Sequence, residues 1–187
     1  MMKSTISKRT FSAIYRLLDR VSPIEQNCGD LCSSVCCTCD SDEPQGPPLL
    51  GIYLLPGEEQ LFTKTEDWLE WSYSKVKGAD FPESWHGTVY FIRCKTPPFC
   101  QRHLRPLQCR TFPLAPHLDD RGALKMILYP SKLPYRCPLI YKRIQLDDRF
   151  IRATLTAWTR LIKDEYIFDL VKYDSSFRTK KELIYVT

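Results

Sequence analysis

Residues 94–117 read CKTPPFCQRHLRPLQCRTFPLAPH, and this stretch limits what the fold can be. Five of its 24 residues are proline, which excludes a long helix or strand. It also contains Cys94, Cys100 and Cys109. We therefore expect an irregular segment that carries cysteines on loops.

The same stretch lies in a run, residues 84–118, that has no acidic residue. The cations of this run are Arg93, Lys95, Arg102, Arg105 and Arg110, and its histidines are His86, His103 and His117. Cations beside thiols lower the thiol pKa and offset the charge of bound thiolates. We expect the arginines to have this role and the histidines to be structural.

A denser cysteine run, CGDLCSSVCCTC, occupies residues 28–39, and Cys137 stands alone in a proline-rich loop. Loops let several thiolates converge on one point, whereas core cysteines usually lie on helix or strand faces. Four thiolates hold a tetrahedral zinc ion or an iron–sulfur cluster. The pattern therefore favours a bound metal over simple burial of the thiols. Because adjacent side chains point apart, we expect that Cys36 and Cys37 do not both bind one ion.

Length and composition are consistent with this interpretation. A chain of 187 residues can bury a sizeable core without disulfides. Nine cysteines are an odd number, the N-terminal 21 residues lack a signal-peptide pattern, and no stretch is apolar enough to span a membrane. We expect a reducing, cytoplasmic location, where clustered cysteines bind metal or do redox chemistry more often than they form disulfides.

Hydrophobic periodicity predicts short regular elements around these loops. Helices are expected at 7–21, 58–77 and 147–165, and strands at 52–55, 88–93 and 123–129. The prediction is a small single-domain α+β protein, residues 1–187. Its irregular Cys-rich loops are packed by the N- and C-terminal helices.

The order of these motifs resembles a known family. The first cysteine run ends in the pair Cys36-Cys37 and is followed by an apolar strand and acidic turn, GIYLLPGEE, and later by LRPLQCRTFPLAP. Over residues 28–137 the chain is similar to the CxxCxxCC proteins, a zinc- or iron-chelating cysteine-cluster family. It departs from them in the three-residue spacing of its first cysteines and in the extra Cys39.

The resemblance implies a metal centre, zinc or [4Fe–4S], built from both halves of the chain. The ligands it implies are Cys28, Cys32, Cys36, Cys37, Cys94, Cys100, Cys109 and Cys137. Arg105, Arg110 and Pro113 match its supporting residues. One branch of the family methylates protein lysines, so whether this chain is an enzyme stays open.

Other functions remain as alternatives. The spacing of Cys32, Cys36 and Cys39 is that of radical S-adenosylmethionine enzymes, but Thr38 replaces their usual aromatic residue and glycine is scarce. A structural zinc protein that binds an unknown protein partner is a second alternative. Nucleic acid is a less favoured partner, because five cations in the acid-free run are a weak basic footprint. The chain has no GxGxxG, GxxxxGK or HExxH motif.

Overall fold

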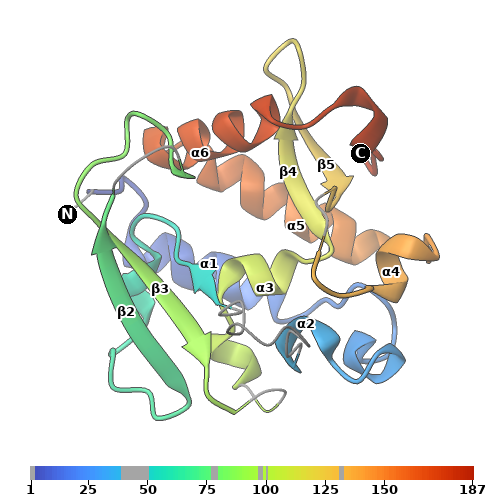
Figure 1. Ribbon diagram of the computed structural model, residues 1–187, viewed down its shortest axis with the longest axis horizontal. Coiled ribbons are helices and arrows are strands. Elements are labelled where there is room, and N and C mark those ends of the chain that lie inside the picture. The colour runs from blue at the N-terminus through green and yellow to red at the C-terminus, as the bar shows by residue number, and fades with distance from the viewer. Residues whose placement is uncertain (1–2, 39–50, 77–79, 97–98, 100, 131–132) are drawn as a thin grey trace.

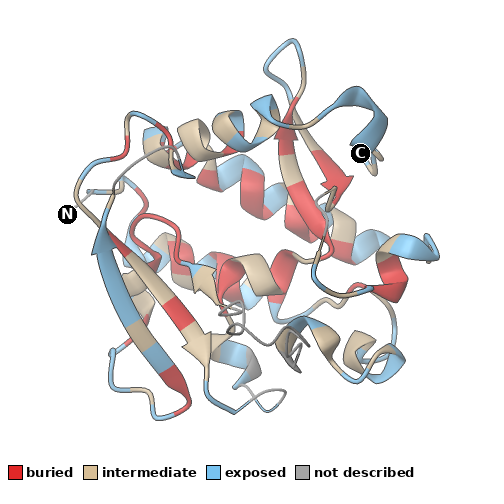
Figure 2. Ribbon diagram, in the orientation of Figure 1, coloured by how far each residue is buried: buried red, intermediate tan, exposed pale blue. Residues whose placement is uncertain are grey.

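Helices from opposite ends of the sequence form the main core. The structure is a computed structural model, and it describes residues 3–38, 51–76, 80–96, 99, 101–130 and 133–187. Helix α1 (Lys8–Leu18) starts at Ser7, whose side chain accepts from the Thr10 amide, and packs on α5 (Asp148–Leu161). Phe11 of α1 and Phe150 of α5 are both fully buried. Figure 2 shows the buried residues concentrated where α1 and α5 face the rest of the protein.

The structure confirms the helix predicted at 147–165, as α5, but the helix ends earlier, at Leu161. A separate helix, α6 (Glu165–Ser176), begins after a short break. Asp164 causes the new start, because its buried carboxylate accepts the amide of Ile167 at 3.2 Å and caps α6. The same carboxylate accepts hydrogen bonds from Ser4 and Thr5, which tie the N-terminal segment to this corner.

A three-stranded antiparallel sheet flanks the helices, in the order β1-β3-β2. Its strands are β1 (Ile52–Tyr53), β2 (Leu69–Lys75) and β3 (Thr88–Cys94). The structure confirms the predicted strands at 52–55 and 88–93 but contradicts the predicted helix over 58–77. In the part of this range that the structure describes, residues 58–76, only the turn η2 (Glu58–Leu61) is helical. Every residue of β2 has a partner on β3, for example Trp71 with Ile92, and this pairing decides against the helix.

A second antiparallel sheet joins β4 (Leu114–Leu118) to β5 (Leu124–Leu128). Strand β5 was expected, whereas β4 lies inside the proline-rich stretch that was expected to be irregular. The C-terminal tail extends this sheet, because the Val186 amide donates to the Met126 carbonyl at 2.8 Å. This backbone pairing holds the tail against β5.

The cysteine-bearing segments fold into single turns beside the core (Figure 1). They are η1 (Cys28–Leu31), α2 (Val35–Thr38), α3 (Leu107–Thr111) and α4 (Pro138–Tyr141), which Cys137 caps. Two further turns, η4 (Arg102–Leu104) and η5 (Lys180–Glu182), contain no cysteine. The protein thus has the predicted α+β fold, with short strands and turn-rich cysteine segments packed by terminal helices.

No helix in the described parts of the chain is long and apolar enough to cross a membrane.

Candidate metal centre

Six of the predicted ligands belong to one neighbourhood, which we call the thiol group. Its members are Cys28, Cys32, Cys36, Cys37, Cys109 and Cys137. They come from the N-terminal cysteine run, from α3 and from the start of α4, which lie together in Figure 1. Charges on Cys28 and Cys109 raise the pKa of Cys36, and the charge on Cys32 raises the pKa of Cys137. None of the cysteines within the described ranges forms a disulfide.

Cys36 and Cys37 bring their thiols close together. Their Sγ atoms are 3.8 Å apart, so the expectation that these side chains point apart is wrong. With Zn–S bonds of about 2.3 Å and tetrahedral angles, two thiolates on one ion lie about 3.8 Å apart. The pair therefore has the spacing that one four-coordinate ion requires, before any ion is added.

The same pair has uneven acidity. The hydrogen bond with Cys36, opposed by desolvation and assisted by the positive charge of Arg105, lowers the pKa of the Cys37 thiol to about 6. The pKa of Cys36 is raised by the hydrogen bond to Cys37, by desolvation and by the neighbouring thiolates. The pair thus loses its first proton readily near neutral pH and resists losing the second. A bound cation would remove that resistance, because metal ligation requires the thiolate form.

A small cavity joins Cys28 to Cys109. Its volume is about 30 Å³, and its polar lining includes Asn27, Arg105 and Arg110. That space suits one or two water molecules or a single ion. Two cysteines and two arginines therefore line a space of ionic size.

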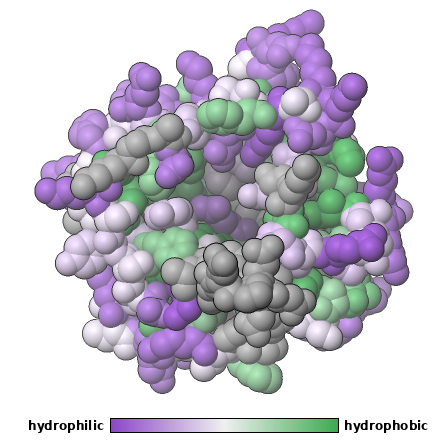
Figure 3. All heavy atoms as spheres, in the orientation of Figure 1, coloured by the Kyte–Doolittle hydropathy of each residue, from purple (hydrophilic) through white to green (hydrophobic). Residues whose placement is uncertain are grey.

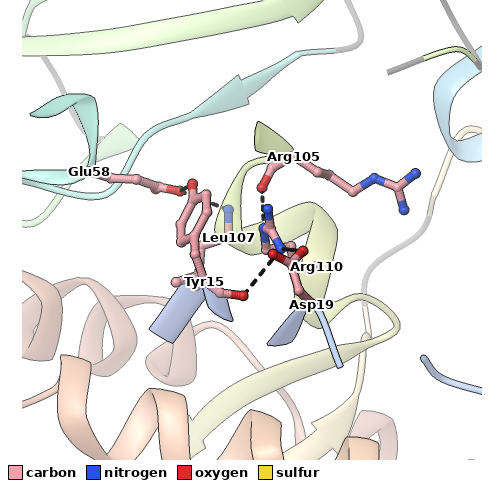
Figure 4. A network of polar contacts seen from close by, with 6 residues as sticks. All are labelled: Tyr15, Asp19, Glu58, Arg105, Leu107 and Arg110. Carbon is pink, nitrogen blue, oxygen red and sulfur yellow. Dashed lines mark hydrogen bonds and ion pairs between the residues drawn. The ribbon is translucent and has the colours of Figure 1, made fainter. Parts of the chain in front are cut away.

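A buried carboxylate fixes the helix that carries Cys109. Glu58 is fully buried, and its Oε1 accepts from the Tyr15 hydroxyl at 2.5 Å and from the Leu107 amide at 2.8 Å, while Oε2 accepts from the Leu55 amide at 3.0 Å. Figure 4 shows Glu58 and Tyr15 meeting at the first residue of α3. Desolvation raises the pKa of Glu58, and these three hydrogen bonds oppose that shift. The network links α1 and the acidic turn to the start of α3.

The two candidate arginines have different surroundings. Arg110 donates to the Asp19 carboxylate at 2.5 Å and to the Arg105 carbonyl at 2.5 Å, and its guanidinium lies 4.2 Å from the centre of the Tyr15 ring. Asp19 therefore offsets part of its charge before any thiolate does. The Arg105 side chain points away from this network (Figure 4), and its charge acts on Cys37. Arg105 is thus the better placed of the two to compensate thiolate charge.

One predicted ligand, Cys94, is not brought into the thiol group. Cys94 ends β3, opposite Leu69, and packs against the smaller core cluster around Trp68. In Figure 1 the end of β3 lies apart from α2. Cys100 and the extra Cys39 lie outside the described residues.

The thiol group is not an assembled metal site. Among the residues that the structure describes, no three His, Cys, Asp or Glu side chains are close enough together to hold an ion. The Cys36–Cys37 pair offers two correctly spaced donors, and the remaining thiols would have to move toward it. Single-turn helices and loops allow such movement more readily than strands or long helices do.

Sequence reasoning missed the residues that support this neighbourhood. Glu58 was read as part of a turn, although an acidic residue directly after an apolar strand and Pro-Gly was a visible signal. Tyr15 and Asp19 were counted only as parts of a helix. Tyr135 was also missed; burial and the charges on Cys36 and Cys137 raise its pKa.

Comparison with known proteins adds no further assignment. No family model matches the chain, and no solved structure matches it. The resemblance to the CxxCxxCC proteins therefore stays a prediction based on the motifs.

Proposed function

We propose that this protein binds metal through cysteine thiolates contributed by both halves of the chain. The observation that carries the proposal is the Sγ–Sγ distance of 3.8 Å between Cys36 and Cys37, in a neighbourhood that also contains Cys28 and Cys109. The cationic Arg105 supports it, because four thiolates around a divalent ion leave a net charge of about −2 that must be offset.

A single zinc ion is the first candidate. Cys36 and Cys37 would supply two ligands, and two further thiols of the group would complete a tetrahedron. Zinc would supply folding energy by tying α2 to the more distant segments that carry Cys109 and Cys137. The residues present fit this ion, since all-sulfur sites are typical of structural zinc.

An iron–sulfur cluster is the second candidate. The cysteines outnumber the four ligands of one ion, which is compatible with a larger centre or with two centres. In a [4Fe–4S] cluster each iron takes one thiolate. The close Cys36–Cys37 pair would then supply one direct ligand and one neighbouring thiol.

Binding of cobalt(II) in place of zinc tests whether Cys36 and Cys37 share one ion. Tetrahedral cobalt(II) with thiolate ligands is strongly coloured, so titration of the reduced, metal-free protein gives a readout that needs no enzymatic activity. We expect one equivalent of Co²⁺ to bind with tetrahedral bands, and the variants Cys36→Ser and Cys37→Ser each to weaken binding at least tenfold. Cys94→Ser is the matched control and should bind like the wild type. A colourless titration, or equal binding by all the variants, would contradict the shared ion.

A further inference from the structure

Charge is divided unevenly along this chain. Residues 84–146 contain eleven of the 27 Lys and Arg residues but only two of the 22 Asp and Glu residues, Asp119 and Asp120. This segment therefore has a net charge of +9, and the rest of the chain has a net charge of −4. Carboxylates from the rest of the chain, solvent ions or a bound anion can offset an excess of this size.

Some of these cations form ion pairs with carboxylates outside the segment. Arg93 pairs with Glu70 across the β2–β3 ladder, and Arg110 pairs with Asp19 of the α1 terminus. Their charges are accounted for within the fold. They need no external partner.

The cations around α4 are different. We call Arg136, Tyr141, Lys142 and Arg143 the α4 patch. The Arg136 guanidinium lies 4.7 Å from the centre of the Tyr141 ring, and the Lys142 ammonium lies 5.7 Å from it. Arg143 follows with a positive φ of 50°, which ends the helix. All four residues are exposed, and no carboxylate in the described parts of the chain pairs with any of the three cations.

Two positive charges beside one ring, with a third on the next residue of the chain, repel one another, and a bound anion would relieve that repulsion. Figure 3 shows strongly hydrophilic side chains over the edge of the molecule where α4 lies in Figure 1. Tyr141 is 49% exposed within this polar edge. The patch thus combines cations for phosphates with an accessible aromatic ring.

We propose that the α4 patch binds single-stranded nucleic acid. Single strands present phosphates together with unstacked bases, which stack on aromatic rings and on guanidinium planes. A duplex hides its base faces, and an acidic protein segment offers carboxylates but no flat ring. A membrane surface is disfavoured, because the aliphatic residues of α4 face the core: Leu139 is 2% exposed, and Ile140 is partly buried against the same core cluster.

The patch adjoins the thiol group along the chain. Cys137 lies between Arg136 and α4, and the charges on Cys36 and Cys137 reach Tyr135. A strand bound at the patch would therefore run beside the proposed metal centre. The binding itself does not depend on the metal proposal, because none of its contacts is a thiol.

Fluorescence anisotropy with a labelled 20-nucleotide oligouridylate and an oligothymidylate of the same length tests the proposal. We expect binding at low salt and a log–log salt slope of about −2, since each phosphate contact on a single strand contributes about −0.7. The triple variant Arg136→Ser, Lys142→Ser, Arg143→Ser should bind at least tenfold more weakly with a slope near zero. Tyr141→Ser should weaken binding about tenfold with the slope unchanged, because stacking is not ionic.

The matched control removes the same charge elsewhere. Arg160→Ser, Lys163→Ser, Lys172→Ser changes three exposed cations of α5, the turn after it and α6, and should bind within twofold of the wild type. Circular dichroism of each variant confirms that it is folded. Three results would each overturn the proposal: absence of binding at 25 mM salt, equal weakening of binding in the control variant, or preference for polyglutamate over both oligonucleotides. The last result would identify an acidic protein as the partner. Metal content measured on the same samples keeps this outcome separate from the proposed function.

Discussion

The Glu58→Ala variant should be strongly destabilised. The carboxylate is fully buried and accepts three hydrogen bonds, from the Tyr15 hydroxyl and from the amides of Leu55 and Leu107. Its removal leaves three donors without a partner in the core, and each buried unsatisfied donor costs about 1–3 kcal/mol. The variant also avoids the free-energy cost of burying a carboxyl group, which offsets part of this loss. We expect a loss of about 3–5 kcal/mol in the free energy of unfolding.

Urea unfolding at pH 7, followed by circular dichroism, measures this loss. Glu59→Ala is the matched control, because Glu59 is the next residue of η2 and is only half-buried. We expect the control to cost less than about 0.5 kcal/mol, as surface substitutions usually do. A loss below about 1 kcal/mol in Glu58→Ala, or an equal loss in the control, would refute the role assigned to this carboxylate.

Three further predictions concern acidity and ligation. Burial raises the pKa of Glu58 above 4.5, so the stability that Glu58 contributes should fall as pH rises from 4.5 through the raised pKa. Thermal unfolding of Glu58→Gln should lack this fall. A rise in the stability of the wild type relative to this variant over the same pH range would contradict the prediction. Arg105→Ser should raise the pKa of Cys37 above about 6, measured by the pH dependence of its alkylation, and an unchanged pKa would show that Arg105 does not act on this thiol. Cys109→Ser should lower the bound metal per chain while Cys94→Ser leaves it unchanged, measured by elemental analysis; the reverse order would place the centre at the end of β3.

Local sequence patterns predicted those elements whose side chains have one dominant periodicity. Phe11, Ile14 and Leu18 repeat at helical spacing and form α1. Strand β2 was missed because Trp68 and Trp71 are three residues apart, which is a helical spacing and not an alternating one. Pairing with β3, which is remote in sequence, selected the strand.

The same limit applies to the candidate site. The density of cysteines indicated a metal centre, and the cations of the acid-free run indicated charge compensation. The sequence could not show that Arg110 would be held by Asp19, 91 residues away, or that Glu58 would accept the amide of Leu107. These contacts arise from packing between distant segments, which no local pattern records.

Metal analysis of the protein purified without oxygen tests the central claim most directly. Elemental analysis and an absorbance spectrum of the same sample report which metal is bound and in what form. We predict stoichiometric zinc in a colourless protein, or iron with sulfide and broad visible absorbance if the centre is a cluster. A folded protein that contains neither metal, and takes up neither when its thiols are reduced, would contradict the account.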